Sequence, residues 1–244
     1  MSNENRVAIV TGSSRGIGQA AAKRLAKDGF AVVVNYAGKA AEANETVEDI
    51  KANGGRAIAL QADIADEVAV AAMFDAATAE FGGVDVVVNS AGIMILGPLV
   101  DFKLDDLDRM HRTNIRGAFV VNQQAARRVR SGGAIINVST SVGRQALPTY
   151  APYAASKGAV EAISLILARE LRGRNITVNA VGPGPTATDL FLNGKDEATI
   201  DRLAKLNPME RLGAPGDIVE VIAFLAGPAR WINGQVIYVN GGMN

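Results

Sequence analysis

The chain has 244 residues, of which 48% are hydrophobic and 20% charged, and its 25 acidic side chains balance 25 basic ones. This composition is typical of a soluble globular protein, and the zero net charge argues against a nucleic-acid partner. With no cysteine and one histidine, disulfides, thiolate ligands and a histidine-rich metal centre are excluded, so we expect no metal site. The polar start MSNENR lacks a signal-peptide core, and no apolar run reaches membrane-spanning length. We therefore expect a cytoplasmic protein with no membrane partner.

Short runs rich in β-branched residues alternate with longer alanine-rich stretches of helical spacing. Strands are predicted at residues 7–11, 31–35, 56–60, 84–89, 134–139, 176–181 and 235–239. Helices are predicted to begin near Ile17, Ala40, Asp66, Leu104, Tyr153 and Ala214. Most strand runs are continuously apolar, and each gap is long enough for a right-handed crossover. The pattern predicts a single α/β domain over residues 1–244: a doubly wound, seven-stranded parallel sheet with helices on both faces.

One segment interrupts this alternation. Residues 183–208 lie between the sixth strand and the next helix and are too many for a routine connection. Long insertions at strand ends often carry function, so we expect a lid-like segment here.

A glycine-rich turn follows the first predicted strand directly. In TGSSRGIG the glycines are Gly12, Gly16 and Gly18, a GxxxGxG spacing rather than the general GxGxxG pattern. Glycines between a strand and a helix let the backbone approach a pyrophosphate, whose charge is favoured by the amides at the helix start. The position of the turn therefore predicts a dinucleotide site.

At this point the chain resembles the short-chain dehydrogenase/reductase family from end to end. The resemblance is carried by six ordered motifs, which are TGSSRGIG, NSAG (89–92), Asn114 in RTNIRG, YAASK (153–157), PGPTAT (183–188) and INGQVIYVNGG. It implies a Rossmann-type domain, a nicotinamide cofactor, hydride transfer between a carbonyl and an alcohol, and a homotetramer, with a dimer as the alternative. The NSAG motif has Ser90 where the family usually has asparagine.

The resemblance also implies a set of cofactor contacts. Asp63 is expected to contact the adenine, although helix capping is an equal alternative for it. Asn89 is expected mainly to stabilise the central sheet. The full expected set is Gly12, Ser14, Arg15, Gly16, Ile17, Gly18, Asn35, Lys39, Asp63, Ile64, Asn89, Ala91, Gly92, Ser139, Tyr153, Lys157, Pro183, Gly184, Thr186 and Thr188.

The end of the second strand bears on the choice of cofactor. An acidic residue there normally binds the ribose 2′-hydroxyl and repels a 2′-phosphate, but this chain has Asn35. Arg15 and Lys39 are the nearby basic residues that could neutralise a 2′-phosphate. We therefore predict a preference for NADP(H), which Asn35→Asp should shift toward NADH.

Spacing selects the reactive tyrosine. Tyr153 has Lys157 at i+4, on the same face of a helix, whereas Tyr150 has Ala154 there. A phenol has a pKa near 10 in water, and a neighbouring ammonium would stabilise its anion. Tyr153 is therefore the predicted general acid/base, with Lys157 as its partner. The family resemblance implies that Lys157 also holds the nicotinamide ribose. By resemblance, Asn114 would connect the lysine to a water chain.

The hydroxyl that polarises the carbonyl is harder to assign. The family serine lies thirteen residues before the tyrosine and three before a glycine, and both counts fall on Thr140. A threonine hydroxyl can donate to a carbonyl, but its methyl group stiffens the rotamer. We predict that Thr140 polarises the substrate and Ser139 lies nearer the cofactor, with Ser141 as the substitute.

The expected function is NADPH-dependent reduction of a small-molecule carbonyl, with 3-oxoacyl thioesters favoured by family frequency and polyols, sugars or hydrophobic ketones left open. A non-enzymatic NADPH sensor and a nucleotide-sugar epimerase are the alternatives. The substrate pocket is expected to be mainly apolar, lined by Ile93, Met94, Val142, Leu147, Leu190 and Phe191.

Overall fold

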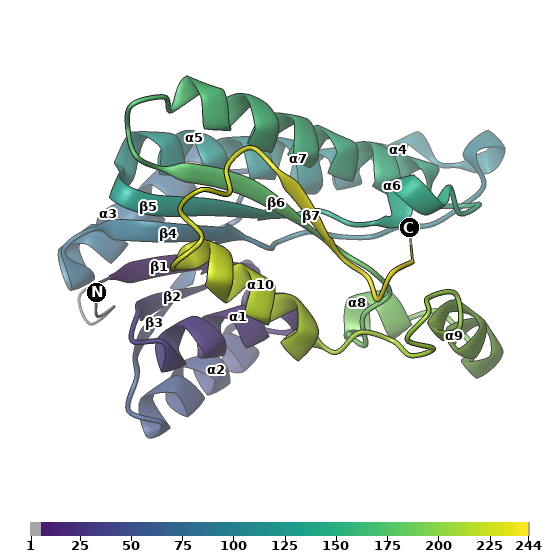
Figure 1. Ribbon diagram of the computed structural model, residues 1–244, viewed down its shortest axis with the longest axis horizontal. Helices are drawn as coiled ribbons and strands as arrows, with labels where there is room; N and C mark the ends of the chain where they lie inside the picture. The colour runs from purple at the N-terminus through teal and green to yellow at the C-terminus, as the bar shows by residue number, and fades with distance from the viewer. Residues whose placement is uncertain (1–5, 244) are drawn as a thin grey trace.

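The computed structural model describes residues 6–243 of the chain. Seven strands form one parallel sheet in the order β3-β2-β1-β4-β5-β6-β7 (Figure 1). This confirms the predicted doubly wound α/β fold. The strands are β1 Val7–Thr11, β2 Ala31–Tyr36, β3 Arg56–Gln61, β4 Val84–Asn89, β5 Val129–Val138, β6 Thr177–Pro183 and β7 Val236–Val239.

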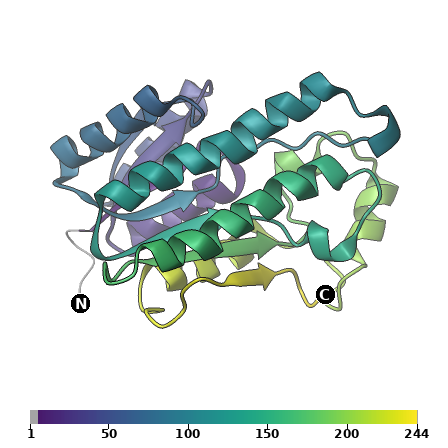
Figure 2. The same ribbon diagram turned by 90° about the horizontal axis from the view of Figure 1, so that it is seen from above.

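Helices cover both faces of the sheet. The main ones are α1 Gly16–Lys27, α2 Ala40–Ala52, α3 Glu67–Phe81, α4 Leu104–His111, α5 Ala118–Arg128, α7 Ala151–Glu170 and α10 Pro215–Ala226. Figure 2 shows α3, α5 and α7 side by side over one face, and α1, α2 and α10 pack on the other. In β1, Ile9 packs in the hydrophobic core under α3, α5 and α7, and Val10 packs in the core under α1, α2 and α10. Both faces of the central strands are buried, which is why their sequences are continuously apolar.

The largest differences from the prediction are at the start of β5 and in the helix before α5. β5 begins at Val129 rather than at residue 134, with a register shift opposite Val84–Val86. Arg130, in this early part of the strand, donates to both carboxylate oxygens of Asp85, which favours the extended conformation. The helix that leads into α5 contains a π-helical turn, η2 Arg112–Gly117, which no periodicity in the sequence indicates.

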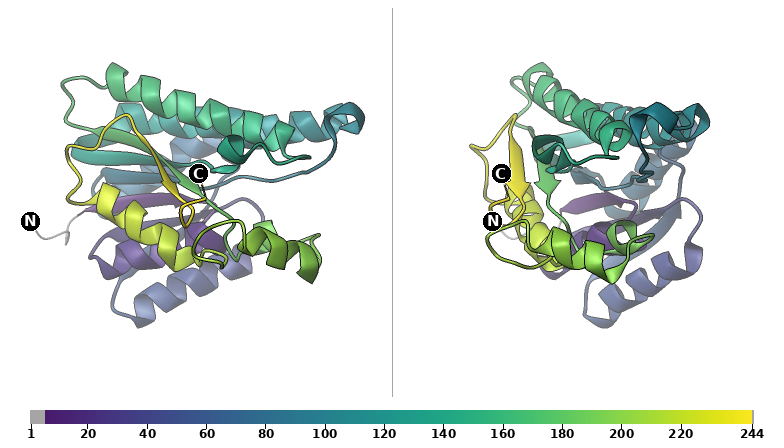
Figure 3. Two further views of the ribbon diagram at one scale, coloured as in Figure 1. Left: turned by 45° about the vertical axis from the view of Figure 1, so that its right-hand side comes forward. Right: turned by 90° about the vertical axis from the view of Figure 1, so that its right-hand side faces the viewer.

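The segment after β6 contains two short helices, α8 Asp189–Leu192 and α9 Glu197–Ala204. Figure 3 shows them beyond the carboxyl ends of the strands, on the side away from the start of the chain. The short helices α6 Val142–Gln145 and η1 Leu99–Asp101 lie in the loops after β5 and β4. Within residues 6–243, no helix combines the length and apolar character that crossing a membrane requires.

Candidate active site

A cavity of about 450 Å³ opens at the carboxyl ends of the strands. The strand order reverses between β1 and β4, and open α/β sheets bind ligands in the crevice at such a switch point. Every residue of the predicted site contacts this cavity except Asn89 and Asn114. The expected apolar wall is also in place, formed by Ile93, Met94, Val142, Leu147, Leu190 and Phe191.

The glycine turn is packed main chain against main chain. A Cβ on Gly12 would lie 2.7 Å from the Ala91 Cα, and one on Gly18 would lie 2.5 Å from the Gly12 carbonyl oxygen. Gly12 and Gly16 also have φ values of +61° and +58°, which disfavour any other residue. The turn and the first turn of α1 therefore form a cradle whose amides fit the pyrophosphate of a dinucleotide.

The buried side chain of Asn35 is hydrogen-bonded to this glycine turn. Its Oδ1 accepts from the Gly12 amide at 3.2 Å, and its Nδ2 donates to the carbonyls of Leu60 and Ala62. Both donors of the amide are thus used by main-chain carbonyls; Asn35 also lines the cavity, and its contact with the cofactor stays a prediction. An aspartate could not make the two donations, so Asn35→Asp would disturb the turn as well as the cofactor preference.

The basic side chains predicted for the 2′-phosphate do reach the cavity. Arg15 lies 3.7 Å from Asp189 of α8, and Lys39 donates to Glu42 at 2.8 Å. Each cation is thus paired with a carboxylate that a bound phosphate would have to replace. Sequence reasoning missed Tyr36, which lines the cavity because β2 extends one residue further than predicted.

Asp63 lines the cavity together with Ile64. Its Oδ1 accepts from the Ala65 amide and its Oδ2 from Arg112 at 2.7 Å. Burial opposes ionisation of Asp63, but these two partners together hold its pKa below the usual value. The cap of α3 is instead Asp66, so the capping alternative for Asp63 is wrong. Arg112, which also lines the cavity, had no sequence signal.

The NSAG motif divides into a buried part and a cavity part. Asn89 lies inside the sheet, where its amide accepts from Thr11 and donates to Asn137; it does not line the cavity, so the expected cofactor contact is corrected and the sheet role holds. Gly92 lines the cavity, and a Cβ there would lie 3.4 Å from the Lys157 Nζ. Ser90 and Ala91 line it as well.

Asn114 lies within the π-helical turn, behind the cavity wall. Its side chain is 1% exposed, exchanges hydrogen bonds with the main chain of Ile93 at 2.9 Å in both directions, and donates to Ser156 on α7. Direct contact of this side chain with a substrate is therefore excluded. The π-helical turn leaves a main-chain carbonyl without its α-helical partner, and the link to a water chain stays a prediction.

Tyr153 and Lys157 lie one turn apart on α7, which begins at Ala151 with Pro152 in its first turn. Burial raises the pKa of Tyr153, and contact with Tyr150 raises it further, while a hydrogen bond with Thr140 opposes the rise. Burial also lowers the pKa of Lys157 to about 8. The Lys157 Nζ donates to the Val138 carbonyl at 2.8 Å and lies 6.0 Å from the centre of the Tyr153 ring.

The three hydroxyls after β5 have distinct partners. Ser139 donates to Glu161 at 2.7 Å, and Ser141 accepts from Gln145 at 2.8 Å. Thr140 accepts from the Val142 amide at 3.3 Å, so its own proton remains available. Of the three, Thr140 is the one whose hydroxyl interacts with Tyr153.

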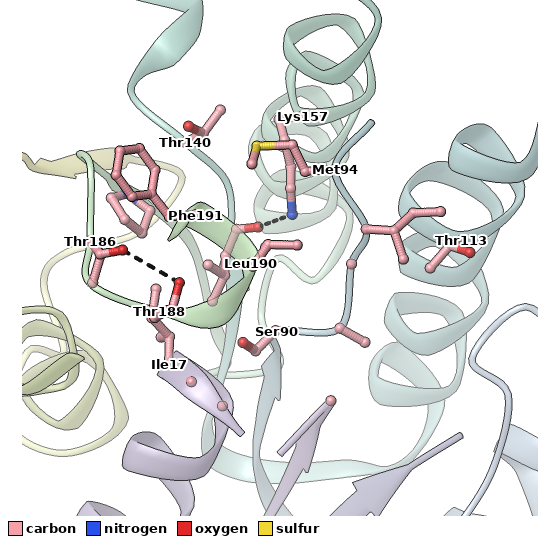
Figure 4. A pocket seen from close by; sticks show the side chains of 18 of the residues that line it. Ile17, Ser90, Met94, Thr113, Thr140, Lys157, Thr186, Thr188, Leu190 and Phe191 are labelled. Carbon is pink, nitrogen blue, oxygen red and sulfur yellow. Dashed lines mark hydrogen bonds between the residues drawn. The ribbon is translucent and has the colours of Figure 1, made fainter. Parts of the chain in front are cut away.

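The segment after β6 closes the remaining side. Pro183, Gly184, Thr186 and Thr188 line the cavity as expected, and Thr188 donates to the Thr186 carbonyl (Figure 4). Figure 4 also shows Leu190 and Phe191 of α8 on this side of the cavity, with Lys157 reaching toward it from α7. Within residues 6–243, no group of His, Cys, Asp or Glu side chains is placed to hold a metal ion.

A dinucleotide cradle beside a tyrosine–lysine pair at the switch point of a doubly wound sheet defines a nicotinamide-dependent oxidoreductase. A family model described as "Enoyl-(Acyl carrier protein) reductase" matches residues 12–244. A "Short-chain type dehydrogenase/reductase" of Picea abies is 44% identical over 97% of this chain and 92% of its own length. Versicolorin reductase stcU of Emericella nidulans is 42% identical over 98% and 96%.

Solved structures agree with the sequence relatives. A short chain dehydrogenase from Burkholderia cenocepacia in complex with NADP has a TM-score of 0.94 and 41% identity, with all of both chains covered. The chain belongs to the short-chain dehydrogenase/reductase family.

Proposed function

We propose that this protein is an NADP(H)-dependent carbonyl reductase that converts a ketone on a largely apolar molecule into a secondary alcohol. The observation that carries the proposal is that Thr140, Tyr153 and Lys157 line one cavity together with apolar side chains, with Tyr153 and Lys157 one turn apart on α7. In the opposite direction the same groups would oxidise the alcohol.

The residues divide the proton chemistry between them. Thr140 donates a hydrogen bond to the carbonyl oxygen and polarises it. Tyr153, whose pKa lies above that of a free phenol, is protonated at neutral pH and donates its proton to that oxygen as the C–H bond forms. The reduced nicotinamide, when bound, supplies the hydride for the carbonyl carbon. Lys157, protonated below about pH 8, offers positive charge to the tyrosine oxygen as it loses its proton.

The cofactor is NADP(H). The glycine cradle fits its pyrophosphate, and Arg15 and Lys39 lie at the part of the cavity next to Asn35, where a 2′-phosphate would carry negative charge. The related Burkholderia cenocepacia structure, which contains NADP, supports this choice.

The substrate is expected to be bulky and apolar around its ketone. Leu147, Leu190 and Phe191 line the cavity, and the last two belong to the 183–208 segment, which we propose acts as the lid. The similarity to versicolorin reductase makes versicolorin the first compound to test, and 3-oxoacyl thioesters remain the second class.

The test is NADPH oxidation over a panel of aromatic ketones, 3-oxoacyl esters and sugars. Tyr153→Phe should lower kcat by about 10²- to 10⁴-fold, because it removes the general acid. Tyr150→Phe is the matched control: this tyrosine also lines the cavity but has no lysine at i+4, so KM should change more than kcat. NADPH binding without turnover of any ketone would contradict the proposal and favour a sensor.

We also propose a homotetramer, with a dimer as the alternative. Phe119 on α5 and Leu165 and Ile166 on α7 are 56%, 41% and 57% exposed on neighbouring helices, where a second copy would cover them. Sedimentation of the wild type and of Phe119→Lys tests this, because a charge on that face should shift the protein toward smaller species.

A further inference from the structure

Consecutive residues at the end of β5 are hydrogen-bonded to α7, the helix that carries the tyrosine and lysine. These contacts join Asn137 to Ser164 at 2.9 Å, the Val138 carbonyl to Lys157 at 2.8 Å, and Ser139 to Glu161 at 2.7 Å. The strand that presents the substrate-polarising hydroxyl and the helix that presents the acid are thus fastened together residue by residue.

Two of these three contacts involve a charged group, the Lys157 ammonium and the Glu161 carboxylate. Ser139 is 3% exposed, and its hydroxyl donates to a carboxylate, with the Lys157 carbonyl 3.5 Å away as a weaker second acceptor. Hydrogen bonds to a charged acceptor are roughly twice as strong as those between neutral groups. This contact and the one from the Lys157 ammonium are therefore the two stronger contacts that hold the strand end.

The position of Ser139 fixes the placement of the residues on either side of it, Val138 and Thr140. The next residue is Thr140, and beyond it the Ser141 hydroxyl is held by Gln145. With both serines anchored, Thr140 is the member of the segment left to face Tyr153. The preceding carbonyl, of Val138, is the one that accepts from the Lys157 Nζ. A displacement of Ser139 would therefore move both reactive contacts at once.

We propose that Glu161 is a positioning residue that, through Ser139, holds Thr140 against Tyr153 and the Val138 carbonyl against Lys157. The inference rests on the proposed reductase function, because it assigns those contacts their catalytic value. Glu161 has no contact with the cavity, so it acts through Ser139 and not on the substrate.

The kinetic test compares variants of Ser139 and Glu161 with a control variant on α7. Glu161→Ala and Ser139→Ala should each lower kcat about tenfold, which corresponds to a rise of roughly 1.4 kcal/mol in the activation free energy. KM should change less than about twofold. The double variant should be no slower than either single one, because both remove the same interaction. Glu161→Gln keeps an acceptor for the serine and should restore most of the loss. Glu170→Ala, an exposed carboxylate near the end of α7, is the matched control and should match the wild type.

A readout without turnover separates this inference from the proposed function. Hydrogen–deuterium exchange of the amides at 137–141 should rise at least about tenfold in Glu161→Ala and Ser139→Ala, but not in Glu161→Gln or Glu170→Ala. If Glu161→Ala fails to fold, Ser139→Ala and Glu161→Gln still decide the question. Unchanged exchange in Ser139→Ala, additive kcat losses, or an equal loss in Glu161→Gln would overturn the inference. Absence of any ketone turnover by the wild type would instead overturn the function and leave the exchange result valid.

Discussion

Around Gly12 the cavity wall is main chain packed against main chain, whereas around Tyr150 it consists of side chains carried by a strained loop. At the cofactor end, the turn has no room for a Cβ at Gly12 or Gly18. At the substrate end, Ala146 and Thr149 adopt φ values of +49° and +73°, unusual for residues that have a Cβ. The comparison shows that the cofactor end is constrained by close main-chain packing, which suits a ligand of fixed shape. The substrate end is constrained by local backbone strain, which leaves room for different substrates.

The largest expected effect tests the close packing. Gly18→Ala would place its Cβ 2.5 Å from the Gly12 carbonyl, and an overpacking cost of about 1–3 kcal/mol should weaken NADPH binding about 10- to 100-fold. Gly158→Ala on α7 is the control, because a Cβ there meets nothing within 4 Å; it should stabilise the helix by about 0.5–1 kcal/mol. Fluorescence titration with NADPH and urea unfolding measure both. Equal NADPH affinities of the two variants would show that close packing does not constrain the cofactor end of the cavity.

The second effect concerns the buried lysine. The pKa of Lys157 falls from 10.5 to about 8 on folding, so between these pH values the unfolded chain binds more protons and stability rises with pH. From pH 7 to 9.5 the wild type should therefore gain about 2 kcal/mol relative to Lys157→Met, measured by urea unfolding. Parallel pH dependences of the two proteins would show that Lys157 is not desolvated.

The same pKa predicts a limit on activity. Loss of the lysine proton should lower kcat for ketone reduction as the pH rises above about 8, while Tyr153, whose pKa is raised, stays protonated.

A smaller effect tests the charge at the cofactor end. Arg15→Ala should lower kcat/KM with NADPH about tenfold, the loss of about 1.4 kcal/mol from a partly exposed charge contact, and change kcat/KM with NADH much less. Lys23→Ala is the control: it lies on the same helix, pairs with Asp49 at 2.7 Å and does not line the cavity. An equal loss with both cofactors would argue that Arg15 does not contact the 2′-phosphate.

The smallest effect tests the strain at the substrate end. Thr149→Gly removes a β-branched residue from positive φ and should stabilise the fold by about 0.5–1 kcal/mol, despite the greater freedom of glycine in the unfolded chain. Thr78→Gly in the interior of α3 should instead destabilise by a similar amount. The Thr149 variant should also discriminate less between ketones, because Leu147 and Tyr150 are then held less firmly. A narrower substrate range would contradict this account.

The same contrast explains what the sequence could predict. The sheet and the glycine turn depend on local patterns, namely apolar runs and glycines at fixed spacing, and these were predicted to within a residue or two except at the start of β5. The pairing of Tyr153 with Lys157 follows from helical geometry. Side-chain partners distant in the chain could not be found in this way, so the hydrogen bonds from Asn35 to Leu60 and Ala62 were not predicted.

Other features had no local signal. Arg112 reaches Asp63 across 49 residues of sequence, and Glu161 reaches Ser139 across 22. Only the fold brings such pairs together, and charged residues on helices are common enough that neither stood out. The choice of Thr140 over its neighbouring serines rests on counting back from Tyr153 and stays a prediction, which the partners of the two serines support.

The buried amide of Asn137 joins the two ends of the cavity. Its oxygen accepts from Asn89 and Asn122, and its nitrogen donates to Asn122 and Ser164, so all four of its hydrogen-bonding positions are used. Opening either the β1–β4 side or α7 would leave buried polar groups without partners, at about 1–3 kcal/mol each. Partial unfolding is thereby penalised, and the nucleotide-binding strands and the catalytic helix are made to unfold as one cooperative unit.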